Sequence, residues 1–269
     1  MERKVVLITG GSSGIGKAIG MYLSSQGFSV YGTTRNLEKH AHFESFELLF
    51  LDVGNVISIQ EAVDTIIAKE GRLDVLINNA GVGITGPIEE TPHEEILKCL
   101  DTNFHGPLHM IKAVLPQMRE QKSGLIINIT SIASYMGLPF RGIYSASKGA
   151  LALATEAMRM EIKTFGIEMT TLGPGDFATN IASGRYHAPV NQNSPYGAAY
   201  AQTLKMINDD VYRAGDPVSV AQKVLSIIKT DQPKVHYRVG AFMQKFSLLL
   251  KKILPDKVYE KLLLNHYKL

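Results

Sequence analysis

The chain has 269 residues, of which 45% are hydrophobic and 20% charged, a balance typical of a folded globular protein and not of a disordered one. Its 28 basic and 25 acidic side chains leave a formal charge of +3, without the block of like charges that indicates a nucleic-acid-binding surface. The single cysteine, Cys99, excludes an internal disulfide and is typical of a reducing compartment, and its apolar neighbours favour packing over reactivity.

The N-terminal segment MERKVVLITG enters a predicted strand almost at once, so we expect no signal peptide. No run of about 18 apolar residues follows, so we expect no membrane-spanning helix. These two features favour a cytoplasmic enzyme. We predict neither a nucleic-acid partner nor a metal site.

Seven short apolar segments are predicted to be β-strands. Several are apolar throughout and rich in Val, Ile, Leu and Phe, which is typical of strands covered on both faces. They occupy residues 4–9, 28–33, 46–53, 73–80, 124–130, 167–174 and 234–240. Helical periodicities lie between them, as in Ile15, Ile19 and Leu23. This alternation predicts an α/β fold with a doubly wound parallel sheet (Rossmann-type) in a single domain, residues 1–269.

Two segments interrupt the alternation. Residues 176–215 are polar and rich in Pro, Gly and Asn. Because ligands bind beyond the carboxyl ends of strands in open α/β sheets, this segment is predicted to be a lid, with a surface excursion as the alternative.

The second segment is a helical tail, residues 241–269. Its apolar residues recur at helical spacing, and Pro255 begins a second helix. They are Phe242, Phe246, Leu249, Leu250, Ile253 and Leu254, with lysines on other faces. Such a helix can lie on a membrane surface, cover the substrate mouth of its own domain or build a dimer interface, and packing against protein is favoured.

A glycine-rich turn, TGGSSGIG, lies between the first strand and the first helix and contains Gly10, Gly14 and Gly16. Glycines allow the backbone to approach a phosphate, and the new helix directs its unpaired N–H groups and positive dipole end at that phosphate. Candidate donors are Ser12, Ser13 and the backbone of Ile15. The spacing differs from G-x-G-x-x-G, so by itself the motif indicates phosphate binding and leaves a plain turn as the alternative.

The second strand ends in VYGTTRN, residues 30–36. An Asp or Glu at this point would bind the ribose 2′-hydroxyl of NAD, whereas an Arg would bind the 2′-phosphate of NADP. Arg35 is present, and no carboxylate occurs before Glu38. We therefore predict NADP(H) over NAD(H), with a solvated surface arginine as the alternative.

Tyr144 and Lys148 are four residues apart on a predicted helix, so their side chains share one face. A phenol is a sluggish acid near neutral pH, and an ammonium one turn away stabilises its anion. Ser131 directly follows the predicted strand 124–130, at the carboxyl end of the sheet where a reacting carbonyl would bind. Taken alone, a Y-x-x-x-K pair is more often a tyrosine packed over a lysine stem.

The glycine turn, NNAG at residues 78–81 and YSASK at residues 144–148 occur together and in order. In this arrangement the chain resembles the short-chain dehydrogenase/reductase family from Val5 to about Gly240, most closely its hydroxysteroid- and retinol-dehydrogenase-like subgroup. The resemblance implies that Ser131 orients the substrate oxygen, that Tyr144 and Lys148 exchange the proton, and that Asn103 holds a water joining Lys148 to solvent.

The resemblance also implies a set of cofactor contacts. Asp52 would bind the adenine amino group beside Val53, and Thr179 the carboxamide of the nicotinamide. The further residues are Asn79, Ala80 and Gly81 along the adenosine, then Pro174, Gly175 and Phe177 near the nicotinamide, in addition to Tyr144 and Lys148. Many NADP-dependent members carry a second basic residue where this chain has Ser13.

We predict an NADP(H)-dependent oxidoreductase that acts on a lipophilic secondary alcohol or ketone, because the predicted pocket wall is apolar. Its substrate contacts would be Ser131, Met136, Leu138, Phe140 and Tyr144. A 3-oxoacyl-[acyl-carrier-protein] reductase, an epimerase or dehydratase, and a non-catalytic nucleotide-binding regulator are the alternatives. A homodimer or homotetramer is expected.

Overall fold

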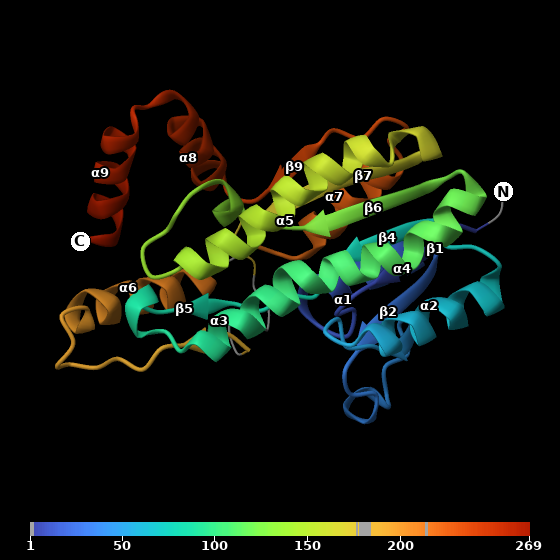
Figure 1. Ribbon diagram of the computed structural model, residues 1–269, viewed down its shortest axis with the longest axis horizontal. Helices are drawn as coiled ribbons and strands as arrows, with labels where there is room; N and C mark the ends of the chain where they lie inside the picture. Colours follow the sequence, from blue (N-terminus) through green and yellow to red (C-terminus); the bar gives the residue numbers. More distant parts are fainter. Residues whose placement is uncertain (1–2, 176, 178–183, 213–214) are drawn as a thin grey trace.

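The computed structural model describes residues 3–175, 177, 184–212 and 215–269. Within them, seven strands form one parallel sheet in the order β3-β2-β1-β4-β6-β7-β9 (Figure 1). Their bounds are β1 (Val5–Ile8), β2 (Ser29–Thr34), β3 (Glu47–Phe50), β4 (Val75–Asn78), β6 (Gly124–Ile129), β7 (Ile167–Pro174) and β9 (His236–Val239). Each overlaps a predicted segment, and the doubly wound α/β fold is confirmed.

Helices cover both faces of the sheet. One face holds α1 (Gly14–Ser25) and α7 (Val218–Ile228), and the other holds α2 (Val56–Glu70), α4 (Gly106–Gln121) and α5 (Gly142–Glu161). Alternate residues of β1 enter opposite cores: Val5 and Leu7 pack beneath α2 and α4, while Val6 and Ile8 pack beneath α1 and α7. Both faces of the strand are therefore buried, which explains its continuous apolar sequence.

The predicted lid contains regular structure that its polar composition did not indicate. A short strand, β8 (Tyr186–His187), pairs with β5 (Ile84–Thr85), and α6 (Gly197–Tyr212) follows. The buried Tyr200 hydroxyl lies 3.0 Å from the Ala188 carbonyl and 3.2 Å from that of Thr85. These bonds hold the described part of the lid against the segment that follows β4.

Helix α3 (His93–Leu100) leads into α4 through a π-helical turn, η3 (Asp101–His105). A 3₁₀ turn, η4 (Ile132–Tyr135), follows β6. At the C-terminus, α8 (Phe242–Ile253) and α9 (Asp256–Tyr267) form a hairpin that stands away from the sheet at one end of the molecule (Figure 1). None of the helices in the described ranges combines the length and apolar character needed to cross a membrane.

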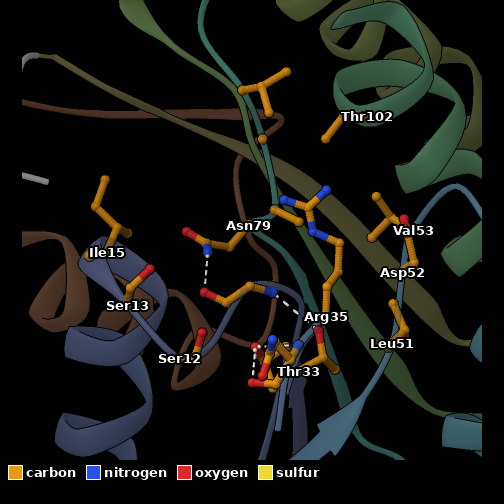
Figure 2. A pocket seen from close by; sticks show the side chains of 17 residues that line it. Ser12, Ser13, Ile15, Thr33, Arg35, Leu51, Asp52, Val53, Asn79 and Thr102 are labelled. Carbon is orange, nitrogen blue, oxygen red and sulfur yellow. Dashed lines mark hydrogen bonds between the residues drawn. The ribbon is translucent and has the colours of Figure 1, made fainter. Parts of the chain in front are cut away.

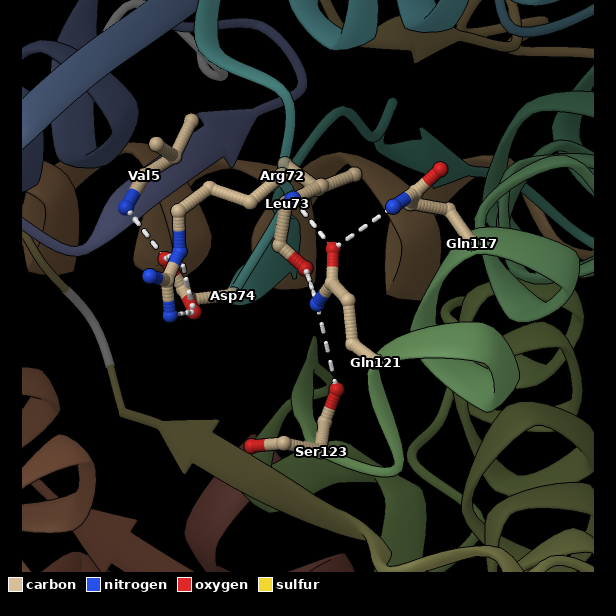
Figure 3. Close-up of polar contacts among 7 residues, drawn as sticks. All are labelled: Val5, Arg72, Leu73, Asp74, Gln117, Gln121 and Ser123. Carbon is tan, nitrogen blue, oxygen red and sulfur yellow. Dashed lines mark hydrogen bonds and ion pairs between the residues drawn. The ribbon is translucent and has the colours of Figure 1, made fainter.

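A polar cluster joins β1, β4 and α4 at the amino-terminal ends of these strands (Figure 3). The buried Asp74 carboxylate accepts a hydrogen bond of 2.7 Å from Val5 N and pairs with Arg72. Gln121 closes the cluster: its Oε1 accepts from Leu73 N at 2.9 Å, and its Nε2 donates to Leu73 O at 3.0 Å.

We expect Gln121→Ala to lower the free energy of unfolding by about 2 kcal/mol, because it leaves the N–H and C=O of the buried Leu73 without their partner. The matched control is Gln60→Ala, which removes one exposed side-chain bond to Asp64. Urea unfolding of both variants measures the difference. Equal midpoints for the two would contradict the structural role of Gln121.

Candidate active site

The glycine turn connects β1 to α1 in the backbone conformation that its glycines allow. Gly10 and Gly14 have φ angles of +65° and +52°, which L side chains rarely adopt. Gly16 does not line the pocket described below; a Cβ there would collide with the Gly10 carbonyl. Gly16 was predicted as a cofactor contact, and the structure places it where it lets α1 pack closely on the turn.

A pocket of about 320 Å³ opens above this turn (Figure 2). It is lined by many residues that the sequence assigned to a cofactor: Gly10, Ser12, Ser13, Gly14, Ile15, Arg35, Asp52, Val53, Asn79, Ala80 and Gly81. Six lining residues were not predicted: Thr33, Thr34, Asn36, Leu51, Val82 and Thr102. The pocket therefore runs from the helix N-terminus to the ends of β2 and β4.

The segment 30–36 shapes one wall of the pocket. The side chain of Thr33 accepts a hydrogen bond of 3.2 Å from Gly10 N, and its carbonyl accepts one of 3.0 Å from Gly11 N. Thr34 Oγ1 accepts from Asn36 N at 3.2 Å. The two threonines thus fix the glycine turn and the bend after β2, which sets the position of Arg35.

Arg35 is exposed and extends from the end of β2 across the pocket, with Asp52 on one side and Ser13 on the other (Figure 2). No hydrogen bond or ion pair of Arg35 occurs within the part of the chain that the structure describes. Asp52 Oδ1 instead accepts from Gly54 N at 2.9 Å. The guanidinium is therefore free to bind an anion in the pocket.

Asn79 lines the pocket and also makes hydrogen bonds that hold the glycine turn. Its Nδ2 donates to the carbonyls of Thr9 and Gly10 at 2.9 and 3.3 Å. The Thr9 hydroxyl in turn accepts from the N–H groups of Asn79 and Ala80 at 2.9 and 3.0 Å. The NNAG segment thus clamps the end of β4 onto the glycine turn.

Asn103 lies in the π-helical turn between α3 and α4 and is completely buried. Its Oδ1 accepts from Val82 N at 2.8 Å, and its Nδ2 donates to Val82 O at 2.9 Å and to Ser147 Oγ at 3.1 Å. A π-helical turn displaces a side chain from the regular helical face, and such turns are frequent at functional sites. Here it holds Asn103 against the segment that follows β4.

Lys148 and Asn103 converge on Gly81. A Cβ at Gly81 would lie 3.2 Å from Lys148 Nζ and 3.1 Å from Asn103 Oδ1. Lys148 Nζ also donates to Ile129 O at 3.0 Å, two residues before Ser131. The lysine is thereby fixed between the ends of β4 and β6.

Ser131 and Tyr144 are the two other predicted catalytic residues. Ser131 begins η4 in a capping box: its Oγ accepts from Ala133 N at 3.1 Å, and its N–H donates to Ser134 Oγ at 3.1 Å. Tyr144 is half-buried on α5, one turn before Lys148, and the Arg141 guanidinium lies 5.3 Å from the centre of its ring. The neighbouring Ser134 hydroxyl is therefore engaged with the Ser131 backbone.

Burial lowers the pKa of the Lys148 ammonium from 10.5 to about 8. Burial also raises the pKa of the nearby Cys99 thiol, so the thiol stays protonated and packs as predicted. The lysine can therefore lose its charge within the working pH range of many enzymes.

For the reductase reaction that the family resemblance implies, we expect kcat/KM to fall by about tenfold per pH unit above about pH 8, where the Lys148 ammonium is lost. The lowered pKa means that the charged form predominates below pH 8 and disappears above it. Initial rates from pH 6 to 10, with circular dichroism as the folding control, measure this limb. A rate that stays constant up to about pH 10 would contradict the requirement for the ammonium.

The residues predicted to contact the substrate and the nicotinamide lie in different surroundings. Met136 is buried, and its sulfur lies 2.9 Å from the Tyr259 hydroxyl of α9, while Leu138 packs against the same cluster. Phe140 lies against Tyr200 of α6, with ring centres 5.4 Å apart. Met136 and Leu138 therefore pack with the tail, and Phe140 packs with the lid; none of the three lines the pocket described above.

Phe177 differs from the prediction. Its ring is buried with the residues of α1 and α7 and forms an isolated bridge to Gly215. We therefore correct its assignment from a cofactor contact to a packing residue. Pro174 and Gly175 end β7 as expected, whereas Thr179 lies outside the described residues.

The residues present fit a nicotinamide dinucleotide. The positive-φ glycine cradle, the helix N-terminus and the free Arg35 guanidinium offer donors to phosphates, and the Lys148 cluster lies at the adjoining strand ends. Gly10, Ser12, Ile15, Arg35 and Asp52 would hold the adenosine and phosphate half. When bound, this group supplies or accepts a hydride. The fold and the site together define a dinucleotide-dependent oxidoreductase.

Comparison with known proteins identifies the family. The family model of short chain dehydrogenases matches residues 4–190. A 3-ketodihydrosphingosine reductase of Bacteroides thetaiotaomicron is 39% identical, over 97% of this chain and 96% of its own length. An NADPH-dependent 3-dehydrocapnine reductase of Ornithobacterium rhinotracheale is 30% identical over 98% of each chain.

Solved structures agree with these relatives. A short-chain dehydrogenase from Streptomyces avermitilis matches with a TM-score of 0.83 and 30% identity, covering 100% of this chain and 97% of its own. The chain therefore belongs to the short-chain dehydrogenase family and is an oxidoreductase.

Proposed function

We propose that this protein reduces the ketone of a long-chain 3-keto amino lipid with NADPH, and that 3-ketodihydrosphingosine represents its substrate class. The observation that carries this proposal is the 39% identity, over nearly the whole of both chains, to a reductase of that name. The proposal narrows the lipophilic ketone predicted from the sequence to one with an amino headgroup.

The pocket supports NADPH as the electron donor. Arg35 extends across it at the end of β2, where a bidentate guanidinium would bind a 2′-phosphate. A relative that is similar over its whole length is named NADPH-dependent. A second arginine or lysine does not occur in the glycine turn, so Arg35 would carry the discrimination alone.

The proposed roles in reduction follow from the positions of the side chains. Ser131, held by its capping box, would orient the carbonyl oxygen, and Tyr144 would donate a proton to that oxygen as its charge develops. The Lys148 ammonium stabilises the resulting phenolate, and Asn103 would connect the lysine to solvent through a water. Leu138 and Phe140, which are both half-buried, would offer apolar surface to an alkyl chain, whereas Met136 is buried in the core beside the tail.

A substrate panel tests this proposal. NADPH oxidation would be followed with 3-ketodihydrosphingosine, a steroid ketone, a retinoid aldehyde and a 3-oxoacyl thioester at equal concentrations. We expect the highest kcat/KM with the keto amine. A preference for the thioester would instead support an acyl-chain ketoreductase, and NADPH binding without turnover of any compound would support a regulator.

A further inference from the structure

The two faces of α8 are both apolar, and only one of them packs against the protein. Leu248 is buried with Ile132 and Met136 beside η4. The opposite face carries a stripe at spacings of four, three and four residues: Phe242, Phe246, Leu249 and Ile253, with exposed fractions of 74%, 37%, 51% and 62%. The expected packing against protein therefore leaves this stripe, called here the α8 stripe, in solvent.

The second helix of the hairpin also exposes apolar side chains. Val258 and Leu262 of α9 lie one turn apart and are 47% and 43% exposed, whereas Tyr259 and Tyr267 make its buried side. Figure 1 shows α8 and α9 side by side at one end of the molecule, beyond the sheet. The hairpin thus presents exposed apolar side chains from both helices.

Positive charge is concentrated on the same hairpin. Residues 242–269 contain six lysines and two acidic side chains, whereas residues 1–241 contain 22 basic and 23 acidic side chains. The net positive charge of the chain therefore lies in the tail. Lys245 and Lys252 are exposed and lie within one turn of Leu249 in the α8 stripe. Lys251 differs, since it pairs with Asp256 at 2.7 Å.

An aromatic and aliphatic stripe flanked by lysines is complementary to an anionic lipid surface, which accepts apolar side chains and attracts cations. A second copy of the hairpin is a poorer partner, because it would bring two lysine-rich tails together. We propose that the exposed face of α8 and α9 docks the protein on a membrane containing anionic phospholipid.

The position of the hairpin connects this surface with the active site. The buried side of α8 contacts η4, the turn whose N-cap is Ser131. The Gln244 amide of α8 fills the space in which a side chain on Gly175 would stand. If the substrate is a lipid, as proposed above, docking would hold the mouth of the site at the surface where that lipid resides.

Vesicle co-sedimentation of the full chain tests the proposal. One set of vesicles contains phosphatidylcholine alone, and the other contains roughly a third phosphatidylserine. We expect the wild type to pellet with the anionic vesicles and to be released in about 0.5 M NaCl. Wild-type protein that stays in the supernatant with both vesicles would overturn the proposal.

Two double variants identify the surface. Phe246→Ser with Leu249→Ser, and separately Lys245→Gln with Lys252→Gln, should each lower the partition coefficient by about tenfold or more. Val56→Ser with Ile57→Ser is the matched control, since both side chains are exposed on α2, away from the hairpin. Equal binding by either hairpin variant and the wild type would contradict the assignment.

Two further measurements separate this proposal from other outcomes. Sedimentation velocity reports whether the serine variant changes the oligomeric state, and loss of a dimer without any vesicle binding would assign the stripe to a second copy. Thermal unfolding and NADPH binding, measured without lipid, establish that the variants are folded. Vesicle binding does not require turnover, so these experiments test membrane docking independently of the proposed substrate.

Discussion

Tyr144→Phe is expected to lower kcat for ketone reduction by about 10³-fold while leaving NADPH binding within about threefold of wild type. The substitution removes only the hydroxyl that would donate the proton. The ring, its contact with Arg141 and the fold of α5 remain. Lys148 and Asn103, which are anchored to the Ile129 carbonyl and to Val82, would keep their positions.

Steady-state kinetics and a fluorescence titration with NADPH measure these two quantities. Tyr22→Phe is the matched control, because Tyr22 is a half-buried tyrosine of α1 on the other face of the sheet. It should retain wild-type turnover. If Tyr144→Phe also retained more than about a tenth of wild-type kcat, the proton donor would have to be another group.

Arg35→Ala is expected to reduce kcat/KM for NADPH by roughly 30-fold, mainly through KM, because it removes a charge-assisted bidentate contact of about 2 kcal/mol. For NADH, which lacks the 2′-phosphate, kcat/KM of the variant should equal that of the wild type. The two coenzymes assayed at one ketone concentration give the ratio directly.

Lys39→Ala controls for charge near the pocket. Lys39 is exposed a few residues after Arg35 and does not line the pocket, so its removal should change kcat/KM by less than about threefold. A wild-type preference for NADH, or an equal effect of the two substitutions, would show that Arg35 does not bind the 2′-phosphate.

The parts of the fold and site that could be predicted are those encoded locally. The strands are continuous apolar segments because both of their faces are buried, and Tyr144 and Lys148 share a face because the helical repeat dictates it. The glycine turn also carries its own signal, since its backbone conformation needs Gly10 and Gly14. A short window of sequence contains all of this information.

The missed features depend on contacts between distant segments. Thr33 lines the pocket because β2 pairs with β1 in a register that sets Gly32 beside Ile8, next to the glycine turn. Phe177 follows a strand end, yet its ring enters the core beneath α1 and α7. Neither outcome can be read from spacing along the chain.

The helices of the C-terminal tail could be predicted from the sequence, but their packing could not. The apolar spacing correctly indicated two helices, but periodicity alone could not determine which face would meet the protein. Leu248 was not among the residues that defined the predicted stripe, and it is the residue of α8 that is buried, whereas Phe242 and Ile253 are exposed. Because both faces of α8 are apolar, only the tertiary contacts with η4 decide between them.

Isotope transfer tests the central claim, reduction of a long-chain keto amine by NADPH, most directly. The protein would be incubated with 3-ketodihydrosphingosine and NADPH carrying two deuterium atoms at C4 of the nicotinamide, and the product analysed by mass spectrometry. The account predicts dihydrosphingosine with one deuterium on the carbinol carbon. Absence of that alcohol, or its formation without deuterium, would contradict it.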